Sequence, residues 1–375
     1  MSTRGSVAVD ARIAAMTAAA TNLLAELQPD ARSAMRYRFD DDAERRSWFY
    51  TPTRHGGVAI RDLDSPVQQR AFQLLATGLS AGGYNTAVLV MGTENILDRL
   101  DGWFPPRFGG RGRDPGWYTI SIFGEPGADR WGWRFGGHHV SLHYTIAGRY
   151  LRATPNFIGI DPASSPLIGG YSFRPLAGME DIAHDLAQSL TPAQQGDGVL
   201  SEVAPFDLVT GNRPHIREGD RPPQAWRTYR DEPPEPRLTE LKRLEERALE
   251  QAGMREEHLA RLEWARKPMG LPVSSMTERQ REMLDRIVEQ YLGRLPDDLA
   301  EHESRRLVGT GEDLHFAWAG GVRPREPHYY RVHGERLVIE YDSFHRDGAH
   351  IHSVWRDAGG DFGDDILADH VRLEH

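Results

Sequence analysis

The segment that decides the fold reads WYTISIFGEPGADRWGWRFGGHHVSLHYTIAGRYLRATPNFIG over residues 117–159. Its aromatic and β-branched residues come in short runs separated by glycine, aspartate and proline, which is the pattern of strands joined by tight turns. Upstream of it, apolar residues recur at helical spacing from Val9 onward. The sequence therefore predicts helices followed by an antiparallel meander. The predicted strands are 117–123, 131–135, 139–146 and 152–158.

A second segment with the same order lies near the C-terminus. Residues 314–356 align without gaps on residues 117–159, and a predicted helix precedes each segment. We therefore predict an α+β fold of two pseudo-symmetric halves, each a helix plus an antiparallel meander. The alignment rests on these identical pairs: Gly124 and Gly321, Arg134 and Arg331, Gly137 and Gly334, Tyr144 and Tyr341, and Arg149 and Arg346.

The chain between the two halves has a different character. It is irregular from residue 201 to about Pro236, and residues 237–267 are rich in charge with leucines at helical spacing. We expect a helical insertion there, peripheral to the rest of the fold. The predicted division is 9–200 for the first α+β half, 201–267 for the irregular linker and helical insertion, and 268–370 for the second α+β half.

Composition excludes several classes of function. The chain of 375 residues contains no cysteine, which removes disulfides, thiol nucleophiles and thiolate-bound metal sites. A net charge of −10 argues against a nucleic-acid surface, since such surfaces carry a basic excess. No run reaches the roughly 18 to 20 apolar residues of a membrane-spanning helix. We expect a cytoplasmic protein with a small-molecule substrate or ligand and neither nucleic acid nor membrane as a partner.

Histidines gather at one point in each half: His138, His139 and His143 in the first, and the region of His350 and His352 in the second. Residues i and i+2 of a strand share a face and lie about 6.5 to 7 Å apart, near enough to bind one ion. His350 and His352 are therefore the best pair. We predict that one of the three histidines of the first half completes their site.

A divalent metal ion of the zinc or iron class is the cofactor that these histidines favour, because without cysteine a metal must be held by His, Asp and Glu. The predicted ligands are His139, His350, His352 and His138. Asp342 and Asp357 are the candidate groups to orient an imidazole or transfer a proton, with Glu340 and Asp347 nearby. Two other interpretations stay open: histidines that only make hydrogen bonds in the core, and an imidazole that acts as a general base without metal.

Three tryptophans and two arginines lie beside the histidines in the sequence. Trp131, Trp133, Arg134 and Trp355 could form a cofactor- or ligand-binding wall, because aromatic faces with a guanidinium suit a planar or carboxylate-bearing molecule. The alternative is ordinary core packing.

At these residues the sequence resembles family 3500 of the domains of unknown function, which occurs in bacteria and fungi. The resemblance covers most of residues 74–370 and supplies no reaction. It implies that His138, His139, His350, His352, Arg356 and Asp357 form one constellation, so Arg356 joins the catalytic candidates; His143 matches less securely, and the insertion near Arg237 is peculiar to this chain. The matching stretches are Ile120 to Gly124, Trp131 to His139, Thr154-Pro155-Asn156-Phe157, His350 to Asp357, and Asp361-Phe362-Gly363.

The function that we predict is a metal-dependent enzyme acting on a small organic molecule, with hydrolysis by metal-activated water slightly favoured. One alternative is a metal-dependent oxidoreductase. Another is a non-catalytic protein that binds a small ligand in a Trp, Arg and His pocket, and a third is a structural pseudo-symmetric scaffold.

Overall fold

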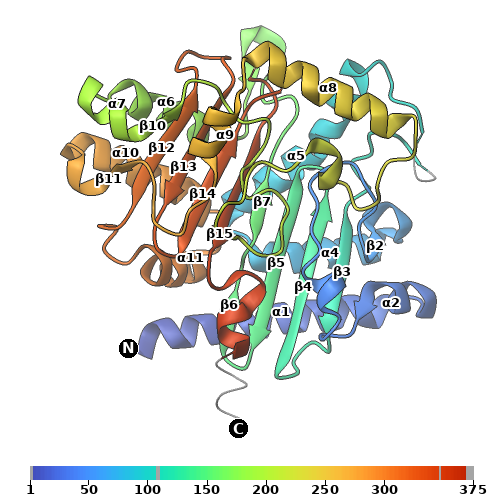
Figure 1. Cartoon of the computed structure of the whole chain (residues 1–375). Coiled ribbons are helices and arrows are strands. Elements are labelled where there is room, and N and C mark those ends of the chain that lie inside the picture. Colours follow the sequence, from blue (N-terminus) through green and yellow to red (C-terminus); the bar gives the residue numbers. More distant parts are fainter. Residues whose placement is uncertain (1–2, 107–109, 346–347, 369–375) are drawn as a thin grey trace. The chain divides into compact units, whose positions relative to one another are not determined.

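A computed structural model describes residues 3–106, 110–345 and 348–368 (Figure 1). The fold is α+β, as predicted, with helices and a mixed arrangement of strands. The chain divides into two compact units: unit 1 comprises residues 1–156, 292–306 and 359–375, and unit 2 comprises residues 157–291 and 307–358. Each unit is thus assembled from segments distant in sequence.

The strands of unit 1 follow the order β1-β3-β4-β5, with β2 also on β3 and β6 also on β5. β3, β4 and β5 form the antiparallel meander that the sequence predicts, whereas the two-residue β1 pairs with β3 in parallel. The bounds are β1 (Arg36–Tyr37), β2 (Val58–Ala59), β3 (Thr119–Gly124), β4 (Arg130–Gly137), β5 (Val140–Ala147) and β6 (Tyr150–Arg152).

Helix α1 of unit 1 buries one apolar side. Met16, Ala20 and Leu23 of α1 are buried, as their spacing of three and four residues requires, and α1 packs on α4 and α11. Arg12 of α1 forms an ion pair with Asp298 of α11 at 3.1 Å. The bounds are α1 (Thr3–Glu26), α2 (Pro29–Met35), α3 (Asp42–Arg45), α4 (Ser65–Gly78), α5 (Ala81–Leu100) and α11 (Asp297–Glu303).

The strands of unit 2 follow the order β7-β15-β14-β13-β12-β10, and β11 also pairs with β12. β12 to β15 are an antiparallel meander, and β10 joins it in parallel. A separate hairpin consists of β8 (Ser165–Pro166) and β9 (Ser172–Phe173). The bounds are β7 (Asn156–Ile158), β10 (Val199–Ser201), β11 (Leu271–Pro272), β12 (His315–Gly320), β13 (His328–His333), β14 (Leu337–Asp342) and β15 (His352–Asp357).

The internal duplication stays a prediction, although each unit contains a meander. The ungapped alignment carries the first residues of β3, β4 and β5 onto residues 316, 327 and 337, while β12, β13 and β14 begin at residues 315, 328 and 337. The predicted division at residues 200 and 267 differs from the two compact units, because contacts between segments far apart in the chain define these units.

Strand alternation gives the unit 2 meander two different faces. The α6 face, covered by α6 (Ala177–Gln188) and α10 (Glu278–Leu292), is aromatic and includes Trp318, Tyr330 and Tyr341. The α9 face carries polar side chains on β13, β14 and β15, and α9 (Glu256–Leu262) contributes the carbonyl of Leu262 to Arg331 at 2.6 Å. These polar residues of the α9 face are Tyr329, Arg331, His333, Glu340, Asp342, His352 and Arg356.

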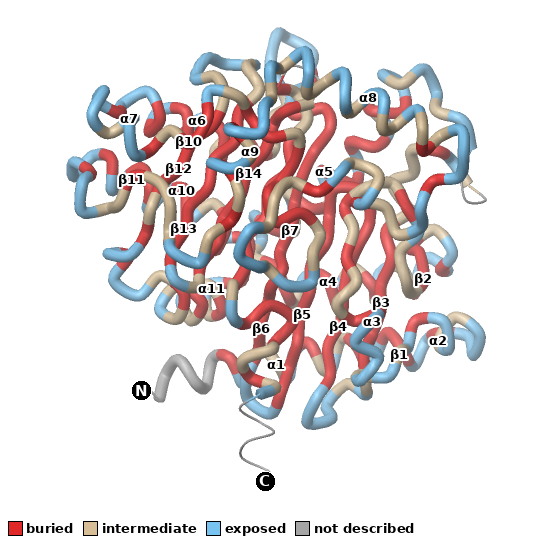
Figure 2. Tube along the Cα trace, viewed as in Figure 1, coloured by how far each residue is buried: buried red, intermediate tan, exposed pale blue. Residues whose placement is uncertain are grey.

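The helical insertion differs from its prediction in two ways. It is not one helix: α8 (Arg237–Ala252) ends at Gly253, which takes a left-handed φ of 73°, and α9 follows. Its second half is not peripheral, because Leu262 is fully buried and Trp264 is nearly so, in the same apolar cluster as Tyr329. Figure 2 shows the contrast between the buried strands and α8, whose residues are mostly exposed or of intermediate burial. The other helix of unit 2 is α7 (Pro192–Gly198).

No helix in the described part of the chain has the length and apolar character needed to cross a membrane.

The buried His333 side chain on the α9 face should make the stability of the protein depend on pH. It lies beside Trp264 with 5.6 Å between ring centroids, and neither ring nitrogen has a hydrogen-bond partner among the described residues. Burial lowers the pKa of His333 to about 3. As pH falls from 6.5 toward 3, the unfolded chain takes up a proton that the folded chain does not, so stability is lost in that window.

We expect His333→Leu to weaken this acid dependence by up to about 1.4 kcal/mol per pH unit. Urea denaturation at several pH values between 4 and 7 measures the effect. An acid dependence identical to that of the parent protein would contradict a neutral, buried His333.

Candidate metal centre

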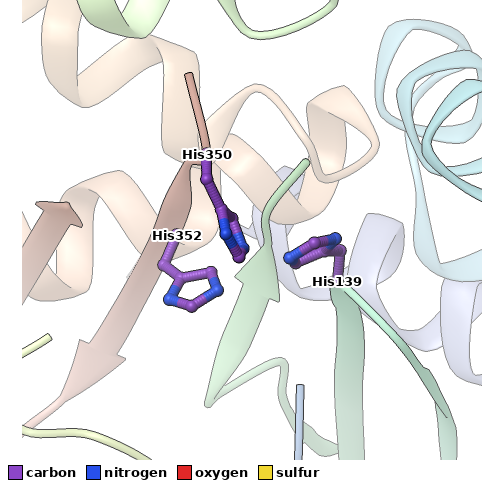
Figure 3. A group of neighbouring side chains, drawn as sticks. All are labelled: His139, His350 and His352. Carbon is purple, nitrogen blue, oxygen red and sulfur yellow. The ribbon is translucent and has the colours of Figure 1, made fainter. Parts of the chain in front are cut away.

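His350 and His352 lie next to each other in unit 2 (Figure 3). Their ring centroids are 4.7 Å apart. His352 begins β15, and His350 comes two residues earlier, just before the bridge between Ile351 and Ile160. The i, i+2 spacing thus brings the two imidazoles together, as extended backbone does. His139, also drawn in Figure 3, belongs to unit 1, so its participation stays a prediction.

Two aspartates meet His352 on the α9 face. Asp342, the last residue of β14, is the direct cross-strand partner of His352, so their side chains project from the same face. Asp207 comes from the irregular segment before α8 and accepts a hydrogen bond from His352 Nδ1 at 2.8 Å. One ligand atom from each of the three residues lies within 4.8 Å of the others. Because Nδ1 donates to Asp207, Nε2 of His352 is the nitrogen that could bind a metal.

A buried carboxylate holds the segment that carries Asp207. Glu340 accepts hydrogen bonds from the backbone amides of Val209 at 2.8 Å and Thr210 at 3.1 Å, and from the hydroxyl of Tyr329 at 2.7 Å. Its side chain is fully buried. Glu340 therefore docks this loop onto the sheet and determines where Asp207 lies.

The two aspartates have opposite pKa shifts. For Asp207, burial acts to raise the pKa, but the charge and hydrogen bond of His352 outweigh it and leave the pKa lowered. For Asp342, burial and then the negative charge of Asp207 raise the pKa well above its usual value. This division is expected when two carboxylates share one buried site.

Asp342 lacks the hydrogen bonds that a buried carboxylate needs. Neither of its oxygens has a hydrogen-bond partner among the described residues. The backbone amide of Phe344 is near enough to act to lower the Asp342 pKa, but it is not in hydrogen-bonding geometry. An unpartnered buried carboxylate is costly, and a bound cation is one way in which proteins compensate for it.

The centre is more open on the side of His350. The His350 side chain is 18% exposed, against 7% for His352. Its Nδ1 lies 3.7 Å from the carboxylate of Asp161, and its ring is 5.3 Å from that of His345. A water or substrate could therefore approach from the His350 side.

Two predicted ligands of the first half, His138 and His139, belong to a group within unit 1. Glu94 of α5, His138 and His139 bring one ligand atom each within 4.8 Å, and His138 Nδ1 is 2.5 Å from the Glu94 carboxylate. His139 is not a strand residue as predicted: together with His138 it forms the turn between β4 and β5, where His139 has a φ of 65°. Gly137, just before this turn, lets the Tyr118 ring approach the backbone closely. A Cβ at residue 137 would lie 2.4 Å from that ring.

The predicted ligand-binding wall is interior. Trp131, Trp133 and Trp355 are each at most 1% exposed, and Trp133 stacks on Tyr144 at 4.2 Å. Arg134 is buried too and forms an ion pair with Glu44 at 2.6 Å. In this structure these side chains make core contacts, and their contact with a ligand stays a prediction.

Asp357 and Arg356, the other predicted catalytic residues, lie on opposite faces of β15. Asp357 is on the α6 face, opposite His352, and forms a two-point ion pair with Arg336 at 3.0 and 2.6 Å. Arg356 shares the α9 face with His352 and donates to the carbonyl of Arg213 at 2.8 Å. The five-residue separation of His352 and Asp357 already indicates opposite faces of a strand. Asp347 lies outside the described residues.

Sequence reasoning did not find Asp207 or Asp161. Both lie in segments without helix or strand periodicity, so no local pattern distinguishes them from other loop aspartates.

Comparison with known proteins identifies the family of this chain and gives no information on the candidate metal centre. No curated protein matches the chain, and no solved structure matches it. The family model described as "Protein of unknown function (DUF3500)" matches residues 9–364. The chain therefore belongs to the DUF3500 family.

Proposed function

We propose that unit 2 is the catalytic part of a metal-dependent enzyme that acts on a small organic molecule. The ion would be held by His352 and Asp342, which with Asp207 offer ligand atoms within 4.8 Å of one another. The neighbouring ring of His350 would supply a further ligand, and Asp207 would orient the His352 ring. The observation that carries the proposal is the buried carboxylate of Asp342, which faces another aspartate and has no hydrogen-bond partner among the described residues.

The donor set, together with the partly exposed side chain of His350, fits a catalytic rather than a purely structural ion. Two imidazoles and a carboxylate leave coordination positions open for water or substrate. A bound divalent ion there would lower the pKa of a coordinated water and so provide a hydroxide for hydrolysis near neutral pH. The more exposed His350 side is the direction from which the substrate would enter.

A second candidate function needs no metal. The hydrogen bond between His352 Nδ1 and Asp207, 2.8 Å long, is the arrangement that prepares an imidazole to act as a general base. Under this alternative, Asp342 holds its proton more tightly than an ordinary aspartate, because burial and the charge of Asp207 raise its pKa.

Metal analysis distinguishes these functions. The full-length chain is purified without a metal column and assayed for bound elements, then for hydrolysis of a panel of chromogenic esters before and after chelation. We expect about one stoichiometric divalent ion at this centre, and we expect chelation to abolish hydrolysis. Hydrolysis that survives complete chelation supports the general-base alternative, and a chain that neither retains nor rebinds zinc or cobalt overturns the proposal.

The sequence-based prediction about His139 is tested separately. Loss of metal from His139→Ala would add His139 to the ligands, and unchanged metal content would remove it from them.

A further inference from the structure

We propose that Glu180, His184 and His328 form a second metal site, of the zinc class, that fastens α6 to the strands of unit 2. Each offers one ligand atom, and these atoms lie within 4.8 Å of one another. The site is independent of the proposed catalytic centre, because His328 projects from the α6 face and Asp342 from the α9 face.

Helix and strand geometry brings the three residues together. Glu180 and His184 are separated by one turn of α6, so they share a helix face. His328 is the first residue of β13, and its ring lies 4.3 Å from that of His184, centroid to centroid. The helix thus supplies two candidate ligands and the strand supplies the third.

The hydrogen bonds of His184 and His328 indicate which nitrogen of each ring has a lone pair for a metal. His184 Nδ1 lies 3.2 Å from the carbonyl of Val322, and His328 Nδ1 lies 2.9 Å from the carbonyl of Glu326. The Ser343 hydroxyl, which can accept as well as donate, is also 2.9 Å from His328 Nδ1. A carbonyl only accepts, so each Nδ1 carries the proton and each Nε2 has a lone pair. Both Nε2 atoms are buried without a hydrogen-bond partner among the described residues. Metal-binding histidines commonly donate their other N–H to a backbone carbonyl in this way.

The surroundings suit a closed site rather than a catalytic one. His328 is fully buried, His184 is 8% exposed and Glu180 is 9% exposed. Glu180 uses one carboxylate oxygen for Arg174 at 2.8 Å, which leaves its second oxygen for a metal. A water would complete four-coordination, the usual number for zinc.

The test uses the full chain carrying Asp342→Asn, which removes a ligand of the proposed catalytic centre. After chelation and dialysis, this protein is titrated with Co²⁺, and binding is followed by the visible absorption of four-coordinate cobalt. We expect about one equivalent to bind and the melting temperature to rise by a few degrees. His184→Gln and Glu180→Gln should each abolish the absorption and the thermal shift.

Matched controls separate ligand loss from damage to the fold. Asp185→Asn changes an exposed neighbour on α6, and His333→Gln changes a buried histidine at the other end of β13. Both should bind Co²⁺ as the parent does, and circular dichroism of the metal-free variants checks that each is folded. Absence of Co²⁺ binding in the parent, or undiminished binding by folded His184→Gln, overturns this site. The proposed catalytic centre is assayed in the His184→Gln chain, so the two proposals fail separately.

Discussion

Asp342→Asn is expected to make the metal-free protein more stable while it removes metal from the proposed catalytic centre. The substitution keeps the shape of the side chain and removes a buried carboxylate that faces Asp207 without a hydrogen-bond partner among the described residues. Removing the like charge that faces Asp207 and offering that carboxylate an amide donor stabilises by about 1–3 kcal/mol. Loss of a direct ligand should weaken metal binding by more than the roughly 10- to 100-fold that an outer-shell partner typically contributes.

Asp342 also determines how the stability of the metal-free protein changes with pH. The folded metal-free chain holds the Asp342 proton more tightly than the unfolded chain does, because burial and Asp207 raise the pKa of Asp342 above 3.8. Its stability therefore falls as pH rises above that value. Asp342→Asn should abolish this fall, which denaturation of the chelated proteins over pH 4 to 8 measures.

Asp357→Asn is the matched control, because Asp357 is an equally buried aspartate whose carboxylate is held by Arg336. Its replacement should lower stability and leave the metal content unchanged. If Asp357→Asn lost the metal and Asp342→Asn kept it, the assignment of ligands would be wrong and the role predicted from sequence for Asp357 would gain support.

Glu340→Ala is expected to produce the largest loss of stability, about 3–5 kcal/mol. The change leaves two backbone amides, of Val209 and Thr210, and the Tyr329 hydroxyl without their buried acceptor. Because the same loop carries Asp207, metal affinity should fall as well, although Glu340 is not a proposed ligand. Urea denaturation measures the first effect, and zinc titration of the folded fraction measures the second.

Hydrogen exchange identifies the part of the chain that loosens in Glu340→Ala. We expect the amides of Leu208, Val209 and Thr210 to exchange faster in Glu340→Ala, since the loop loses its attachment to β14. Glu335→Ala, at an exposed position just before the same strand, should change neither stability nor exchange. Slow exchange of the loop in Glu340→Ala would mean that other contacts hold Asp207.

The helices and strands that depend on the spacing of nearby apolar residues could be predicted from the sequence. Alternation of apolar residues over 117–159 and 314–356 indicated the two meanders, and apolar spacing indicated the helices around them. The prediction for 237–267 was wrong in two respects. A glycine in the left-handed conformation ends α8 at Gly253, and Leu262 is buried by strand residues far away in sequence.

By itself, the sequence determined the α+β class, the membership of the family and the pairing of His350 with His352, because strand periodicity and residue identity are local properties. Only the tertiary structure decided the rest of the candidate centre. Asp207 reaches His352 because buried hydrogen bonds to Glu340 dock an irregular loop across 130 residues of chain. No periodicity along the chain encodes such a contact, since it depends on which polar groups are buried together when the loop and the strands pack.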